Sequence, residues 1–174
     1  MELLGKKAIV LVEQMYNDYE FIYPYYRLLE AGAEVDLVAP EAGKKYPGKA
    51  GTSATSTLAA KDADPEVFSG LLIPGGFGPD FMRRHKPMVD LVREMHRRGK
   101  IVAAICHAGW MLASAKILSG KKATSFFGIK DDLIHAGAEW VDQEVVVDGN
   151  LITSRTPDDM PAFMRAVIAG MKDK

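Results

Sequence analysis

The chain has 174 residues, of which 48% are hydrophobic and 26% are charged, and its formal net charge is -1. This length suffices for one domain with a proper core, so we expect a single domain over residues 1–174. The near-zero charge argues against nucleic-acid binding, and no apolar run reaches the ~18 residues that cross a bilayer. The first residues lack a signal-peptide layout, so we expect a cytoplasmic protein without a membrane partner.

Strands and helices are expected to alternate along the chain. Continuous apolar runs predict buried strands at 6–12, 34–39, 70–74 and 101–105. Helical spacing predicts helices at 19–31, 64–68, 79–98 with a break at Pro87, 107–118 and 157–171. Residues 41–60 predict loops or small strands, and 145–153 predict a small C-terminal hairpin that turns at Asp148-Gly149. The alternation predicts an α/β fold whose mostly parallel sheet is covered on both faces.

Three of the predicted strands end in residues that can do chemistry. Val12 precedes a cluster of carboxylates, Pro74 precedes a Gly-Gly pair, and Ile105 precedes a Cys-His pair. In open α/β sheets, sites form outside the carboxyl ends of the strands. We therefore expect these three strand ends to form one site.

Cys106 is the only cysteine, so it can form neither an intrachain disulfide nor a thiolate-only metal site. One interpretation is a packed apolar thiol, because free cysteines are often buried. The other is a reactive thiol, because a helix N-terminus favours the thiolate and the position resembles a nucleophile elbow. The backbone N–H of the next residue, His107, is placed to stabilise an oxyanion.

Two interpretations are open for Gly75 and Gly76. They form a plain strand-to-helix turn, or their backbone N–H groups form an oxyanion hole together with that of His107. Among the carboxylates after the first strand, most are solvated helix-start charges, and one is a candidate acid/base partner of the thiol. The histidines show no metal-ligand spacing and no phosphate loop is present, so we expect no metal and no cofactor.

These motifs resemble the PfpI intracellular protease branch of the ThiJ/PfpI superfamily. The most specific pieces are AICHAG at 104–109 and LIPGG at 72–76, supported by SFFGIKDD at 125–132 and AEWVDQEVVVDGN at 138–150. The resemblance covers essentially the whole chain. It implies a flavodoxin-like three-layer sandwich, a homodimer or an assembly of dimers, and Cys106 as the nucleophile. It also implies His107 and a carboxylate from a neighbouring subunit, here Asp80, as catalytic residues.

One position departs from the family pattern. The family places a glutamate after the first strand, hydrogen-bonded to the nucleophile, and an ungapped alignment puts Asn17 there. An amide can donate a hydrogen bond to a thiolate but cannot shuttle a proton. Glu13 and Asp18 are the candidate substitutes for the missing acid/base group. Glu20 is expected to be a structural residue inside the helix.

Two functions follow from the sequence. The first is a cysteine-dependent hydrolase or lyase of the PfpI type, with peptidase, deglycase or glyoxalase-like activity on reactive aldehydes, glycated proteins or peptides. The second is a stress-responsive redox protein without turnover, in which a nearby donor stabilises oxidised Cys106. The absence of the family glutamate is the reason for the second function.

Overall fold

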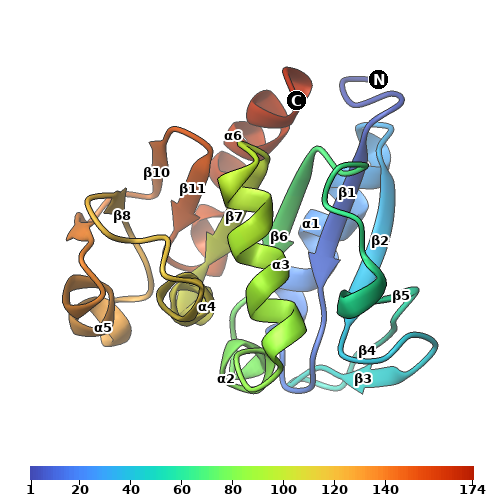
Figure 1. The fold of residues 1–174 in the computed structure, drawn as a ribbon, viewed down its shortest axis with the longest axis horizontal. Coiled ribbons are helices and arrows are strands. Elements are labelled where there is room, and N and C mark those ends of the chain that lie inside the picture. Colours follow the sequence, from blue (N-terminus) through green and yellow to red (C-terminus); the bar gives the residue numbers. More distant parts are fainter.

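A seven-stranded sheet forms the centre of the molecule, and the computed structural model describes all residues from 1 to 174. All neighbouring strands pair in parallel except β10 and β11, which pair antiparallel. In spatial order the strands are β10 (Val145–Asp148), β11 (Leu151–Ser154), β7 (Ile101–Ile105), β6 (Gly70–Ile73), β1 (Lys7–Leu11), β2 (Glu34–Ala39) and β5 (Leu58–Ala59). Helices lie on both sides of this sheet (Figure 1), which confirms the predicted flavodoxin-like α/β sandwich.

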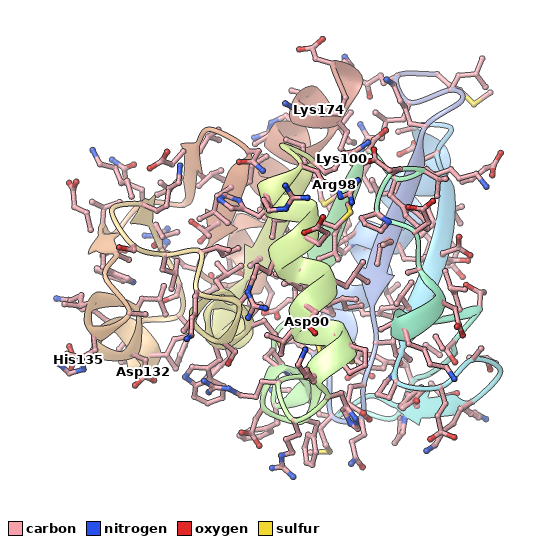
Figure 2. All side chains as sticks on the ribbon, in the orientation of Figure 1. Asp90, Arg98, Lys100, Asp132, His135 and Lys174 are labelled. Atoms are coloured by element: carbon pink, nitrogen blue, oxygen red, sulfur yellow. The ribbon has the colours of Figure 1, made fainter.

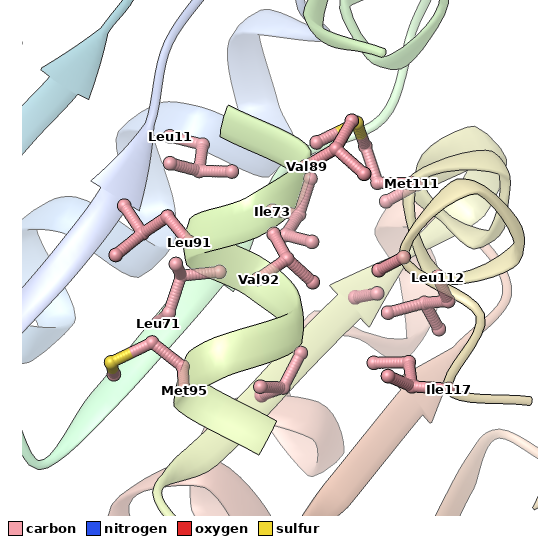
Figure 3. Packing of buried hydrophobic residues seen from close by; sticks show 14 of the residues in the cluster. Leu11, Leu71, Ile73, Val89, Leu91, Val92, Met95, Met111, Leu112 and Ile117 are labelled. Atoms are coloured by element: carbon pink, nitrogen blue, oxygen red, sulfur yellow. The ribbon is translucent and has the colours of Figure 1, made fainter. Parts of the chain in front are cut away.

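Two apolar clusters hold the three layers together, one on each face of the sheet. The main covering helices are α1 (Asp18–Glu30) and α6 (Met160–Lys172) on one face, and α3 (Lys86–Arg97) and α4 (Gly109–Ala115) on the other. Successive residues of a strand point to opposite faces, so Ile9 joins the α3 cluster and Val10 joins the α1 cluster. Figure 3 shows the α3 side, where Leu71 and Ile73 of β6 pack beside Val92. Burial of both strand faces explains why the strands read as continuous apolar runs.

The remaining elements lie at the edges of the sandwich. They are η1 (Ala60–Asp62), α2 (Gly78–Met82), η2 (Cys106–Ala108), η3 (Phe127–Ile129), α5 (Lys130–His135), η4 (Pro157–Asp159) and two small sheets, β3 (Lys45–Pro47) with β4 (Ser53–Thr55) and β8 (Lys122–Ala123) with β9 (Glu139–Trp140). The small strands β3 and β4 confirm the prediction for residues 41–60. No helix has the length and apolar character that crossing a membrane requires.

The helix predicted at 64–68 is wrong. That segment is a turn, and a 3-10 helix lies just before it at Ala60–Asp62. The Asp64 carboxylate accepts a hydrogen bond from the backbone N–H of Glu66, at 3.0 Å, which closes a local turn around Pro65. Aspartate commonly competes with helix formation in this way.

The C-terminal hairpin is part of the main sheet rather than an appendage. Its strands turn at Gly149-Asn150, one residue later than predicted, and β11 then pairs in parallel with β7. The predicted helix 79–98 is divided in two, because α2 ends at Met82 and α3 begins at Lys86, just before Pro87. Proline suits the first turn of a helix, so Pro87 belongs to the start of α3.

Candidate functional site

Cys106 lies at a sharp turn between β7 and α4. All five residues of β7 are buried, and the chain then enters a 3-10 turn over Cys106–Ala108 before α4 starts at Gly109. The backbone φ of Cys106 is +62°, a left-handed conformation that is uncommon for any residue except glycine. The elbow geometry predicted from the sequence is therefore present, and the sulfur sits at the carboxyl edge of the sheet.

The Gly75-Gly76 pair follows β6 and faces the elbow. A Cβ atom added at Gly75 would lie 2.5 Å from Glu20 Oε2 and 2.7 Å from Cys106 Cβ, so only glycine fits there. The N–H group of Gly75 donates to Glu20 Oε2 at 2.8 Å, which occupies this donor and removes it from the predicted oxyanion hole. The N–H groups of Gly76 and His107 instead point to the Cys106 sulfur. They are the two candidate oxyanion donors.

Glu20, not Asn17, is the group beside the nucleophile, and the sequence prediction was wrong on this point. Glu20 is fully buried in the first turn of α1. Its Oε1 atom has no partner at ordinary hydrogen-bond geometry, yet the carboxyl group is close enough to Cys106 for each to shift the pKa of the other. The ungapped alignment misplaced this residue by one helical turn.

Glu20 and Cys106 share a site that disfavours charge. Burial raises the pKa of Glu20 to about 7, against smaller lowering effects from Gly75 and Cys106. Burial and then the Glu20 charge raise the pKa of Cys106 to about 12. This direction is opposite to the one expected from the helix N-terminus, because burial outweighs the two backbone donors. When Glu20 is protonated, its repulsion is lost and it can donate to the sulfur, so the pair behaves as one coupled acid.

Asn17 has a different position from the one predicted. It is the N-cap of α1, and its Oδ1 accepts hydrogen bonds from the N–H groups of Tyr19 at 3.1 Å and Glu20 at 3.4 Å. Its own backbone N–H donates to Gly75 O at 3.0 Å. The cap begins α1 at Asp18 and thereby places Glu20 in the first turn, facing the carboxyl edge.

Neither predicted substitute for the glutamate reaches the sulfur. Glu13 is buried, but its carboxylate lies 3.1 Å from His85 Nε2. The Asp18 carboxylate accepts hydrogen bonds from Ala50 N–H at 2.8 Å, Thr52 N–H at 2.9 Å and the Thr52 hydroxyl. Both carboxylates are thus occupied by other partners, and the prediction that one of them serves Cys106 was wrong.

The His107 ring lies beside the sulfur, with 3.2 Å between Nδ1 and Cys106 Sγ. The ring stacks on Phe126, with centroids 4.8 Å apart, and meets Trp110 edge-on. Burial, and then the charge of Lys49, lower the pKa of His107, so the ring is neutral at pH 7. According to its tautomer, Nδ1 of a neutral ring accepts a hydrogen bond from the thiol or donates one to a thiolate.

Asp80 lies in α2, and its carboxylate forms an ion pair with Arg84 on the surface. It does not line the hollow above Cys106 of its own chain. A catalytic role for Asp80 therefore requires a second copy of the chain, and it stays a prediction.

A hollow of about 230 Å³ opens above the sulfur. Its floor consists of Glu20, Gly76, Cys106 and His107, and its rim consists of Asn17, Lys49, Phe77, Phe126, Thr156 and Pro157. The sequence reading missed Glu20 and the rim residues apart from Asn17. The position of Glu20 could have been predicted from the sequence, because asparagine followed three residues later by glutamate is the pattern of a helix start. No sequence pattern indicates the rim, since its residues come from five separate segments.

The other histidines and hollows offer no comparable chemistry. No group of three or more His, Cys, Asp or Glu side chains could hold a metal ion. His135 lies with Asp132 on helix α5 (Figure 2), and it does not line the hollow above Cys106. A larger open hollow of about 570 Å³ on the outside of α1 is lined by side chains such as Tyr23 and Tyr26 and contains no nucleophile.

Comparison with known proteins identifies the family of this chain. Residues 6–170 match the model of the DJ-1/PfpI family. The chain is 45% identical to a deglycase of Pyrococcus horikoshii, covering 95% of this chain and 99% of that one, and 42% identical to protein/nucleic acid deglycase 2 of Escherichia coli, covering 95% and 97%. The crystal structure of Drosophila melanogaster DJ-1beta superposes with a TM-score of 0.88 at 29% identity, covering 98% of this chain and 92% of that one. The protein described here therefore belongs to the DJ-1/PfpI family.

Proposed function

We propose that the protein is a cysteine-dependent deglycase with glyoxalase-like chemistry, acting on 2-oxoaldehydes and on their adducts with amines and thiols. The observation that carries this proposal is the closeness of buried Glu20 to Cys106 on the elbow. Glu20 Oε2 and Cys106 Cβ both lie within 2.7 Å of the Cβ position at Gly75, and both residues line the same hollow. The family relatives named deglycases support the substrate class. The sequence suggested that the family glutamate was missing, so that no residue could transfer a proton at carbon. Glu20 supplies that carboxyl group.

The first step forms a bond between Cys106 Sγ and the aldehyde carbon. With a free aldehyde, the carbonyl π bond breaks and the oxygen takes the thiol proton. With an adduct, the sulfur displaces the carrier amine or thiol, which leaves with a proton. The N–H groups of Gly76 and His107 stabilise the negative charge that develops on the oxygen. Glu20 or neutral His107 accepts the thiol proton as the bond forms and passes it to that oxygen or to the leaving carrier.

The second step moves a proton between the two carbons of the bound fragment. Glu20 takes the proton from the former aldehyde carbon, which gives an enediol, and returns it to the neighbouring carbon. The hydroxyl proton of the former aldehyde carbon passes to the neighbouring oxygen, so a thioester of a 2-hydroxy acid results. Water then hydrolyses the thioester, releasing the 2-hydroxy acid and the free thiol. A base with a pKa of about 7 suits this relay, because it gains and loses protons readily at neutral pH.

The test compares Cys106→Ala, Glu20→Gln and the matched control Glu13→Gln for consumption of methylglyoxal and release of lactate. We expect no turnover in Cys106→Ala and a loss of roughly 10²–10⁴-fold in Glu20→Gln, the usual contribution of a general acid/base. Glu13→Gln should keep its activity, because Glu13 pairs with His85 outside the hollow. Unchanged turnover in Cys106→Ala would refute the proposal.

A redox response is the second candidate, and the same Glu20 supports it. A protonated Glu20, whose Oε1 has no partner, can donate a hydrogen bond to an oxygen of a Cys106 sulfinate. Intact mass after mild peroxide treatment separates the two functions. Uptake of oxygen at Cys106 without any aldehyde turnover would favour the redox function over the enzyme.

Peptidase activity would need a further group that orients the His107 ring. We propose that Asp80 of a second copy of the chain is this group. This arrangement depends on the predicted homodimer or assembly of dimers. Light scattering coupled to gel filtration measures the assembly, and Asp80→Asn should then lower peptide hydrolysis without lowering methylglyoxal consumption. Loss of both activities in equal measure would contradict a separate role for Asp80.

A further inference from the structure

The rim of the hollow carries a positive charge without a partner. Lys49 lines the hollow together with Cys106, its side chain is exposed, and no carboxylate lies within ion-pair distance of its ammonium group. The only carboxylate that lines the same hollow is Glu20, which is fully buried in the floor. The floor binds the reacting carbonyl in the proposed function. A cation at the entrance can therefore select substrates that carry a negative charge on the part away from that carbonyl.

The turn between β3 and β4 fixes Lys49 in this place. Its backbone N–H donates to Tyr16 O at 3.0 Å, and Tyr16 forms bridges to both Gly48 and Gly76. The three hydrogen bonds accepted by Asp18 hold the next residues of the turn, Ala50 and Thr52. The chain that presents the lysine is therefore tied directly to the floor of the site.

Asn17 supplies a second donor on the same rim. Its Oδ1 atom caps α1 by accepting hydrogen bonds from the helix N–H groups. The Nδ2 group of the same amide donates to no protein atom. Asn17 and Lys49 both line the hollow. Together they provide an ammonium and an amide, a set of donors that matches the two oxygens of a carboxylate.

We propose that Lys49 and the Asn17 amide form a carboxylate-binding subsite, which selects adducts whose carrier is a small amine or thiol bearing a carboxylate, such as a free amino acid. The hollow of about 230 Å³ has room for a three-carbon fragment over the sulfur, with the carrier at the rim. Substrate selection of this kind rests on the proposed deglycase function, whereas binding of an anion at the rim does not.

Alkylation of Cys106 tests the subsite without any turnover. Iodoacetate and iodoacetamide react with the same thiolate and differ in charge, so the ratio of their rates cancels changes in the pKa of the thiol. We expect Lys49→Met to lower the iodoacetate-to-iodoacetamide ratio by roughly fivefold, which corresponds to the upper range for an exposed charge pair. The matched control is Lys45→Met, which removes an exposed lysine from β3 outside the hollow and should leave the ratio unchanged.

Asn17→Asp separates the amide from its capping role. Aspartate caps a helix as well as asparagine does, so α1 should keep its start, while the donor becomes a carboxylate. We expect this variant to lower the same ratio by at least as much as Lys49→Met. Equal ratios in wild type, Lys49→Met and Asn17→Asp would overturn the subsite.

Turnover then tests the substrate class. The hemithioacetals of methylglyoxal with N-acetylcysteine and with N-acetylcysteine amide differ only in the carboxylate of the carrier. Wild type should consume the first with a higher kcat/KM, and Lys49→Met should remove most of that preference. Turnover without any preference refutes the substrate class and leaves the deglycase proposal intact. A ratio of alkylation rates that depends on Lys49, in a protein that consumes neither adduct, refutes the deglycase proposal and leaves the anion subsite intact.

Discussion

The floor and the rim of the Cys106 hollow are built differently. The floor combines a residue with φ of +62°, glycines with no room for a side chain, and two buried acids. The rim combines side chains from separate turns, among them exposed Lys49 and Phe77. The difference indicates that the floor determines which reaction occurs and the rim determines which substrate reaches it.

The largest effect is expected at the floor, in Gly76→Ala. The residue has φ of +75°, and an added Cβ would lie 2.5 Å from Asn17 N and 2.7 Å from Met15 O. These are backbone atoms of the segment that joins floor to rim, so they cannot move away cheaply. We expect the free energy of unfolding to fall by about 3 kcal/mol or more. Urea denaturation provides the measurement.

Gly5→Ala is the matched control for this change. Gly5 has nearly the same φ, +77°, but nothing lies within 4 Å of an added Cβ. Only the backbone conformation opposes the substitution, and the expected loss is about 1 kcal/mol. Equal losses in the two variants would show that the floor is no more constrained than a surface turn.

The second prediction concerns the pH dependence that Glu20 gives to stability. Its pKa is raised from 4.5 to about 7 in the folded protein, so between these values the folded state binds more protons than the unfolded state. Stability contributed by protonated Glu20 is therefore complete below pH 4.5 and is lost as pH rises through 7. Relative to Glu20→Gln, wild type should lose about 3 kcal/mol of unfolding free energy between pH 4 and pH 8.

Urea denaturation of both proteins across this range checks the prediction. The glutamine variant lacks the titrating group, so the difference between the two curves isolates Glu20. Curves that run parallel from pH 4 to pH 8 would mean that Glu20 ionises at its ordinary pKa. The acid of the floor would then be no different from a solvated carboxylate on the protein surface.

The third prediction concerns Asp18, which connects floor and rim. Asp18→Ala removes three hydrogen bonds from the turn that carries Lys49, and we expect a loss of about 2 kcal/mol. Amide hydrogen exchange at Ala50 and Thr52 should accelerate, since their N–H groups lose their acceptor. The control is Asp36→Ala, which removes a single exposed hydrogen bond with Thr57. Unchanged exchange at both amides would show that the turn holds its shape without the carboxylate.

The same division explains what the sequence could and could not predict. The strands and the elbow were predictable because their signals are local, namely continuous apolar runs and small residues after Cys106. The meeting of Cys106 with Gly76 followed from one topological rule about parallel sheets. The rim was not predictable, because Lys49 and Thr156 lie more than a hundred residues apart and meet only through the fold.

The role of Glu20 beside Cys106 was predicted wrongly from the sequence. The sequence reading started the helix at residue 19, whereas α1 starts at Asp18 with Asn17 as its cap. The Asn17 cap holds Glu20 in the first turn, where its carboxylate accepts a hydrogen bond from the N–H of Gly75 and lies beside the sulfur. A helix that starts at residue 19 also has Glu20 in its first turn, so the error came from the ungapped alignment, which put Asn17 in the place of the family glutamate. The spacing of Asn17 and Glu20, typical of a helix start, was the local signal against that alignment.

The smallest effect on stability is expected at the rim, in Phe77→Ala. The ring is 55% exposed, so its loss should change the free energy of unfolding by less than about 0.5 kcal/mol. It lines the hollow, however, and its removal takes away apolar contact that substrate and transition state share. KM should therefore rise while kcat stays nearly constant. Val67→Ala, at a side chain 54% exposed and outside the hollow, should change neither constant. A fall in kcat at constant KM would place Phe77 in the chemical step, and floor and rim would then act as one unit.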